Sequence, residues 1–279
     1  MKHPALRRVA ALVLLTAASH APASFAQAAP AGKDKAAAPA AGVDAELLLR
    51  SCAGDAHRNA KLYVARAHGI ELMKRSADRN QARSMMRIES QLEGMLAQLR
   101  GRGAVDADLT RMEDALVGLT ELTLQQPVVE QIDAALRLAA HAADACARMV
   151  TGLRYDAAAT PAGERVRRLS SMLAASQQLA GVHLAALLRK GGASATDVAA
   201  SVTLAQSFEA ELAPLRKTAD ADAQLASSLA LVDGQWLFIR QALSLPRENA
   251  RTKLEDMGRA SELLFEVIEG ELRRQRRRG

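Results

Sequence analysis

The sequence predicts an all-α protein built from two tandem antiparallel up-down-up-down four-helix bundles. Apolar residues make up 49% of the chain but aromatic residues only 3%, and Ala and Leu supply most of the apolar content. This composition favours helices, because β-branched and aromatic side chains are what pack a sheet. Glycines and prolines divide the chain into helix-length segments, in which apolar residues recur at every third or fourth position. Short connections between such segments make neighbouring helices antiparallel.

Residues 1–26 have the three parts of a secretory signal peptide. An apolar run at 9–18, about half as long as a membrane span, is followed by small residues that fit cleavage after Ala26. Cleavage after Ala28 fits almost as well, and an uncleaved anchor is the alternative. We therefore expect an exported, periplasmic protein. The positive start of the signal is made by Lys2, Arg7 and Arg8.

The first bundle is expected over residues 44–155. It follows residues 27–43, which are mostly Ala, Pro, Gly and Lys and predict a disordered linker. The breaks between its helices are the turn-forming stretches 78–80 and 101–103 and Pro127. The helices themselves are predicted at 44–75, 79–100, 105–125 and 128–154.

The second bundle is expected over residues 161–273, followed by a basic tail at 274–279. Its breaks are Gly191-Gly192, the loop 220–222 and Pro246, the usual punctuation at helix ends. Its helices are predicted at 163–190, 194–218, 221–244 and 247–273. The last has the clearest apolar stripe, made by Leu254, Met257, Ser261, Leu264, Phe265, Ile268 and Leu272.

A shift of 119 residues relates the ends of the two halves. Earlier in each half the shift is 115 or 116, which brings His68 onto His183. Self-similarity over such a period indicates a duplicated domain. Under the longer shift Pro127 falls on Pro246, Leu138 on Met257, Cys146 on Phe265 and Met149 on Ile268.

The start of the second half carries a family motif. Residues 165–174 read Arg-Val-Arg-Arg-Leu-Ser-Ser-Met-Leu-Ala, after Ala162-Gly163. This stretch resembles AGRQRMLSQRMAK, the first-helix motif of the N-terminal sensor domain of type IV pilus methyl-accepting chemotaxis transducers (PilJ-type), related to nitrate and nitrite sensor domains. The resemblance covers about 160–272, and residues 60–63 extend it weakly to the first half as a second degenerate copy. Later segments similar to the family are 208–215, 236–240 and 260–265.

The resemblance implies a periplasmic sensor that binds a small anion such as nitrate or nitrite and passes the signal to a protein partner or through a homo-oligomer. By position it places the anion at Arg167, with Arg165 and Arg168 beside it. A guanidinium suits this role, because its planar donors match pairs of oxygens. The first half has Cys52 at the position that matches Arg167. The alternative is that the three arginines are solvated charges, in a structural or adaptor bundle that binds no small molecule.

Charge and motifs argue against several other classes of protein. The formal net charge of +6 is concentrated in the leader and in the last seven residues, so we expect no basic face for nucleic acid. The arginine-rich end is interpreted as a solvated helix end, with weak contact to anionic lipid or a partner as the alternative. No Ser/His/Asp set, phosphate-binding loop or haem motif occurs. We therefore expect no enzyme and no cofactor.

The histidines do not form a metal site in the sequence. His68 and His183 recur on apolar faces and are interpreted as core or interface residues, because a metal site needs three or four ligands. His57 and His141 have no counterpart in the second half and are interpreted as surface residues.

The two cysteines, Cys52 and Cys146, are expected to form a disulfide. In an antiparallel bundle, both lie about two turns from the same end, one in the first helix and one in the fourth. An exported protein enters an oxidising compartment. A bridge would close a loop of about 95 residues and contribute about 4–5 kcal/mol on the chain-entropy estimate. The alternative is two independent buried thiols.

Overall fold

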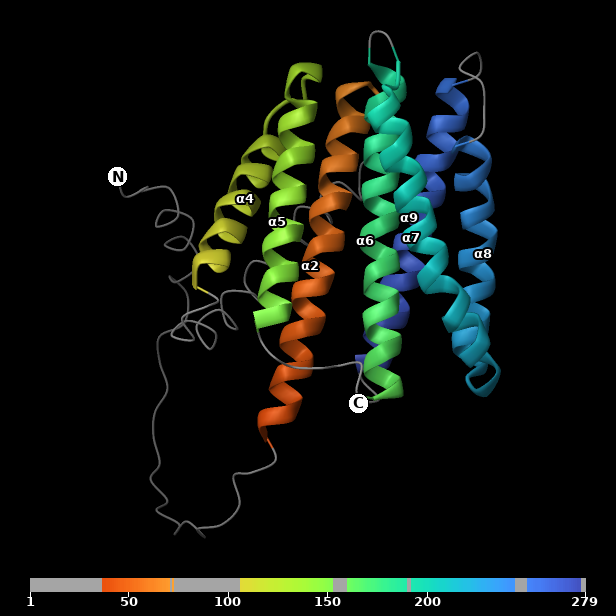
Figure 1. Ribbon diagram of the computed structural model, residues 1–279. Coiled ribbons are helices and arrows are strands. Elements are labelled where there is room, and N and C mark those ends of the chain that lie inside the picture. Colours follow the sequence, from red (N-terminus) through yellow and green to blue (C-terminus); the bar gives the residue numbers. More distant parts are fainter. Residues whose placement is uncertain are drawn as a thin grey trace, which may run out of the picture. The chain divides into compact units, whose positions relative to one another are not determined.

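The part of the chain that the computed structural model describes is almost wholly helical (Figure 1). It covers residues 37–70, 72, 106–152, 160–189, 192–243 and 250–276. No strand occurs in these ranges, so the all-α prediction is confirmed. The signal peptide and the helix expected at 79–100 lie outside the described residues. The α-helices are α2 (Ala37–Ala67), α4 (Asp106–Leu124), α5 (Ile132–Gly152), α6 (Pro161–Leu188), α7 (Ala195–Thr218), α8 (Ala223–Leu243) and α9 (Ala250–Arg276), with 3₁₀-helices η1 (Val129–Gln131) and η3 (Ala219–Ala221).

Helix α2 departs most from the sequence-based boundaries. It begins at Ala37, inside the segment expected to be a linker, because alanine has the highest helix propensity and Pro39 falls in the first turn, where proline is tolerated. It ends early because Gly69 takes a positive φ of 65°. The Ile70 N–H then donates to the Ala65 carbonyl at 2.8 Å, which closes the helix end. The linker prediction is therefore wrong from Ala37 on.

The starts of α6 and α7 are set by local capping. The Thr160 hydroxyl accepts from the Gly163 N–H at 3.0 Å, and Pro161 occupies the first turn, where its missing N–H costs nothing. At α7, Ser194 and Asp197 form a reciprocal capping box. These caps fix both helices close to their predicted starts.

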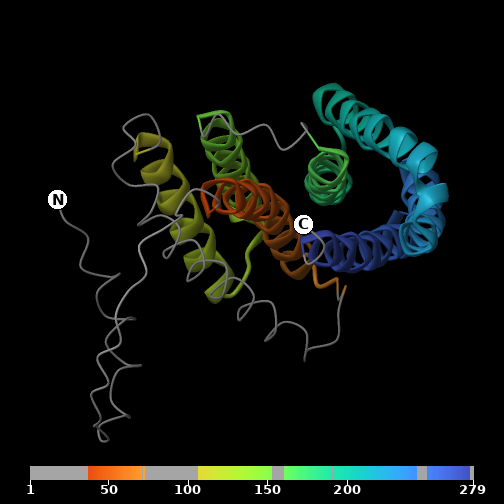
Figure 2. The same ribbon diagram turned by 90° about the horizontal axis from the view of Figure 1, so that it is seen from below.

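The helices of the two halves share one core. Helix α2 packs along both α5 and α6, α6 also packs on α7 and α9, and the remaining close pairs are α4 with α5 and α8 with α9 (Figure 2). A continuous hydrophobic cluster runs through all of them, within one compact unit that starts at Ala37. Every residue from 59 to 65 is buried. A helix buried all round has to be covered on several sides, and α2 is covered from both halves.

Helix α6 is the one helix among the described residues that is long and apolar enough to cross a membrane by length and composition. In the structure, 67% of its most apolar window is buried. A helix that contacts α2, α7 and α9 needs apolar side chains on most of its surface. Its composition therefore matches its place in the core.

Candidate functional site

The three arginines expected to bind an anion lie in the first turns of α6. Arg167 forms ion pairs with Glu164 on its own helix at 2.8 Å and with Glu211 on α7 at 3.1 Å. Arg168 contacts the same two carboxylates at 2.5 and 2.8 Å. The Arg165 Nε atom is buried without a hydrogen-bond partner.

This cluster is electrically balanced, with two guanidinium groups against two carboxylates. The hydrogen bond from Arg167 holds the pKa of Glu164 below its usual range, against the effect of burial. The pKa of Arg167 is raised in turn, chiefly by its hydrogen bond to Glu164. A small anion would have to displace Glu164 or Glu211 to reach the guanidinium groups. The contacts tie α6 to α7.

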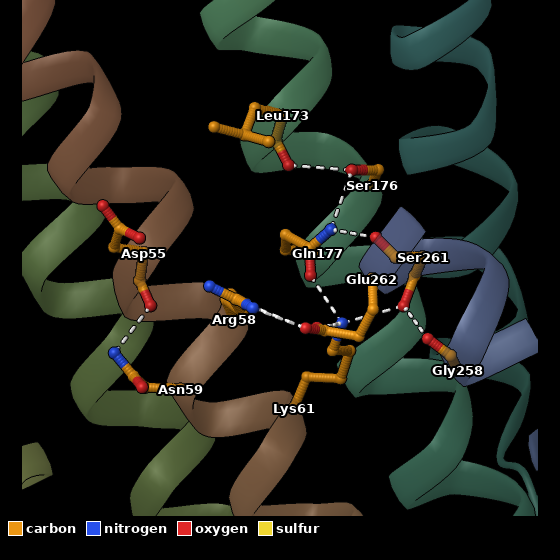
Figure 3. A network of polar contacts seen from close by, with 10 residues as sticks. All are labelled: Asp55, Arg58, Asn59, Lys61, Leu173, Ser176, Gln177, Gly258, Ser261 and Glu262. Atoms are coloured by element: carbon orange, nitrogen blue, oxygen red, sulfur yellow. Dashed lines mark hydrogen bonds and ion pairs between the residues drawn. The ribbon is translucent and has the colours of Figure 1, made fainter. Parts of the chain in front are cut away.

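A second polar cluster lies where α2, α6 and α9 meet (Figure 3). Its centre is Lys61 on α2, whose side chain has no exposure to solvent. The Lys61 Nζ donates to Gln177 Oε1 at 2.6 Å, to Ser261 Oγ at 2.8 Å and to the Glu262 carboxylate. Arg58, one turn earlier, donates to the same carboxylate at 2.7 and 3.0 Å. We call these five residues the central network.

Hydrogen bonding within the central network is complete around the lysine. An ammonium group has three donors, and each of the three acceptors comes from α6 or α9. Gln177 also bridges these two helices, because its Nε2 donates to the Ser261 carbonyl at 2.9 Å. The network therefore joins one helix of the first half to two helices of the second.

The ionised side chains of the central network stabilise one another, and this offsets the cost of burying them. Burial lowers the pKa of Lys61 to about 8, while Glu262 acts to raise it. Burial acts to raise the pKa of Glu262, but Lys61 and Arg58 outweigh it and hold that pKa below its usual range. The Arg58 guanidinium also lies 4.1 Å from the ring centroid of Phe265, a cation–π contact.

A groove of about 430 Å³ opens between α2, α5 and α6. Its lining combines small apolar residues with polar ones, and Arg50 and Asp144 carry opposite charges on it. The uncharged polar residues are His57, Thr151, Ser170, Ser171 and Gln178. Two of its hydroxyl groups are already used within their own helices: Ser170 Oγ donates to the Val166 carbonyl at 2.8 Å, and Thr151 Oγ1 to the Ala147 carbonyl at 3.1 Å. The apolar lining includes Leu49, Ala53, Ala140, Ala143, Ala147, Val150 and Ala174.

The groove exists because α5 has small residues where α9 has large ones. Helices α5 and α9 are related by the shift of 119 residues, under which Ala143 matches Glu262 and Cys146 matches Phe265. On α9, the Glu262 carboxylate and the Phe265 ring contact Arg58 from α2. On α5, the smaller side chains leave space beside α2 and α6. Under the shift of 119 residues, the groove therefore has small side chains where α9 has Glu262, of the central network, and Phe265.

His57 is a buried polar side chain of the groove. It is 6% exposed, lines the groove and makes no hydrogen bond with the part of the chain that the structure describes. Burial lowers its pKa to about 4, so the ring is neutral at pH 7. The sequence-based prediction that His57 lies on the surface is wrong, because α2 is covered on two sides. His141 on α5 is exposed, as expected.

Of the other predicted residues, the two cysteines lie within the core and the two recurring histidines are half-buried. Cys52 and Cys146 are both buried, on helices α2 and α5 that pack together, and both are thiols in the structure. The disulfide stays a prediction. His68 is half-buried, and His183 hydrogen-bonds to the backbone of Ala242. Within the described ranges, no group of three or more His, Cys, Asp or Glu side chains is placed to hold a metal ion.

No family model, curated protein or solved structure matches this chain. The function is therefore inferred from the geometry of the groove and of the central network.

The sequence-based interpretation missed Lys61, Arg58, Glu262 and the role of His57. A signal for Lys61 was present, because it interrupts the apolar run from Ala60 to Val64. Such a charge in a helix buried all round needs a partner. The local pattern around Lys61 does not indicate its partner, Glu262, which lies 201 residues further along the chain.

Proposed function

We propose that this chain is an exported, non-enzymatic sensor module that binds a small molecule in the α2–α5–α6 groove. The observation that carries the proposal is a groove between three helices that is lined by small apolar residues and by a largely buried imidazole, His57, which has no described hydrogen-bond partner. A neutral imidazole has a donor and an acceptor, so this ring can hydrogen-bond a ligand that enters the groove. A volume of about 430 Å³ falls within the usual range of small-molecule sites.

The position of the groove supports a sensor rather than a simple carrier. Helices α2 and α6 form two of its walls, and the same two helices hold the central network with α9. A ligand that changes the packing of α2 against α6 would bias the contacts with Glu262 and so alter the second half. A partner protein or a second copy would receive that change. The PilJ-type resemblance and the division into two tandem bundles remain parts of this proposal.

The experiment is thermal unfolding of the purified chain with a panel of small molecules at fixed ionic strength. The panel contains neutral aromatic compounds, together with nitrate, nitrite and small carboxylates. A ligand at about 100 times its dissociation constant adds about 2.7 kcal/mol to the stability of the folded state. Each compound is tested on the wild-type chain and on Ala143→Leu, which fills the groove. It is also tested on Arg167→Ala, which opens the α6–α7 ion-pair cluster.

The variants assign any stabilisation to a site. A shift in melting temperature that disappears in Ala143→Leu and persists in Arg167→Ala supports the groove. A shift with nitrate that disappears only in Arg167→Ala moves the site to the α6–α7 cluster. The absence of any shift removes the ligand-binding proposal.

The second candidate is a structural or adaptor protein that binds no small molecule. It is favoured by large apolar side chains that are about half exposed on the outer helices. They lie on α7 and α8: Val198, Val202, Leu231, Leu237 and Phe238. Sedimentation velocity over a hundredfold range of concentration tests self-association through this surface, because Phe238→Asp should shift a dimer toward monomer.

A further inference from the structure

We infer that the groove selects neutral, mainly apolar molecules of roughly 15–20 non-hydrogen atoms that carry one hydrogen-bonding group, and that His57 binds that group. This inference rests on the proposed function and names the ligand class of the same site. Three features of the groove carry it: the charge of its lining, the hydrogen-bonding capacity left open, and the size of its side chains.

The charge of the lining disfavours ionic ligands. Arg50 and Asp144 are its only charged residues and have opposite signs. The largely buried ring of His57 is neutral at pH 7, because burial lowers its pKa to about 4. A carboxylate or ammonium group placed against this ring would lose hydration without gaining an opposite charge from it.

His57 supplies the hydrogen-bonding capacity of the buried part of the groove, and Ser171 and Gln178 add polar groups to its lining. A neutral imidazole has one N–H donor and one nitrogen acceptor. The hydroxyl groups of Ser170 and Thr151 already donate to carbonyls of their own helices. An alcohol, phenol, amide or secondary amine on the ligand would satisfy His57 as donor, acceptor or both.

The side chains of the walls set the shape of the rest of the ligand. Alanines from all three helices border the groove, and Leu49 and Val150 add apolar surface. Transfer of apolar surface from water to such walls is favourable. An aromatic or aliphatic body therefore binds against them more favourably than a polar one.

The test uses two fluorescent probes with one skeleton. N-phenyl-1-naphthylamine is neutral and has a single N–H group, and 8-anilino-1-naphthalenesulfonate is the same molecule with a sulfonate added. Fluorescence titration of the full chain at pH 7 should show binding of the neutral probe about tenfold tighter than that of the anionic probe.

Two leucine variants locate the bound probe. Ala143→Leu extends a side chain into the groove and should weaken the neutral probe about tenfold or more. The matched control is Ala230→Leu on α8, at an exposed position away from the groove. The control should bind the probe like the wild type, and circular dichroism should show the same helix content in both variants.

Two further variants test the histidine. His57→Leu keeps an apolar body but removes hydrogen bonding, and should weaken the neutral probe about fivefold. His57→Gln restores a donor and an acceptor and should recover most of the affinity. A structural role alone would leave probe binding unchanged in His57→Leu, and that result would overturn the assignment of His57.

The outcomes separate this inference from the proposed function. Equal or tighter binding of the anionic probe, blocked by Ala143→Leu, overturns the neutral ligand class and leaves a small-molecule groove. Binding of neither probe, or binding that survives Ala143→Leu, removes the groove as a site, and the proposed function fails with it.

Discussion

At the scale of single residues, the central network holds a charge where solvent does not reach. Removing an ammonium group from water costs several kcal/mol, and its ion pair with a carboxylate offsets that cost only when the remaining donors are satisfied. Here Gln177 and Ser261 supply the two other acceptors of Lys61. The pair therefore specifies how α2 meets α6 and α9 more than it adds net stability.

Neutralising Glu262 is expected to be more damaging than removing both charges. Glu262→Gln leaves Lys61 buried beside neutral groups and should lower the free energy of unfolding by about 3 kcal/mol. The double variant Lys61→Met/Glu262→Gln should recover more than half of that loss. Urea unfolding followed by circular dichroism measures both. A loss below about 1 kcal/mol for Glu262→Gln would show that solvent, or loss of the Lys61 proton, relieves the buried charge.

His57 predicts a loss of stability in mild acid. The unfolded chain protonates this ring near its ordinary pKa of 6.5, whereas the folded chain does so only near 4. The unfolded state binds more protons between these values, so the free energy of unfolding falls as pH falls from about 6.5 to about 4. The effect has an upper limit of about 3 kcal/mol.

Urea midpoints at pH 7 and pH 5, in wild type and His57→Leu, test this dependence. The variant should unfold at a higher urea concentration at pH 7, because an apolar side chain replaces a largely buried polar ring. It should also lose less stability at pH 5. Burial lowers the pKa of His183 as well, so part of the wild-type slope should remain in the variant. An unchanged slope would place the acid sensitivity elsewhere.

At the scale of elements, most helices could be predicted from the chain because their signals are local. Thr160-Pro161 and the Ser194–Asp197 capping box fix where α6 and α7 begin. The end of α2 also had a local signal, Gly69. The low-complexity composition at the start of α2 predicts a linker, whereas the helix propensity of its alanines favours the helix that forms there.

Two glycines of α9 provide a matched pair of helix substitutions. A Cβ at Gly270 would meet nothing within 4 Å, whereas one at Gly258 would lie 2.3 Å from Leu72 Cδ2. Gly270→Ala should raise the free energy of unfolding by about 0.5–1 kcal/mol through helix propensity. Gly258→Ala should lower it by about 1 kcal/mol, because Leu72 has to move. Equal effects in thermal unfolding would show that α9 is not packed closely at Gly258.

At the scale of the whole molecule, the helices of the two halves share one hydrophobic core. The sequence predicts a duplication, but a repeat does not state how its copies pack. Neither the groove nor the central network could be predicted for that reason: each needs α2 and α6 side by side, and α5 or α9 beside them. The predicted arginine site was a local motif, and its partner Glu211 on α7 became apparent only in three dimensions.

Differential scanning calorimetry should therefore give a single transition for the intact chain. The calorimetric and van't Hoff enthalpies should agree, as for one cooperative unit. Glu262→Gln should move the whole transition without splitting it, because the network spans both halves. Two resolved transitions in the wild type would instead favour two independent bundles.

The residues that meet around Lys61 lie far apart along the chain. Their separation sets an order of folding. Lys61 is 116 residues from Gln177 and 201 from Glu262. During synthesis or export, α2 can pack on α5 first, then on α6, but its charge has no counterion until α9 emerges. Contacts between distant residues slow folding, because loop closure has to precede them. Chains that end before residue 262 would carry a lysine with no carboxylate to meet, and quality-control proteases would encounter them in an open form.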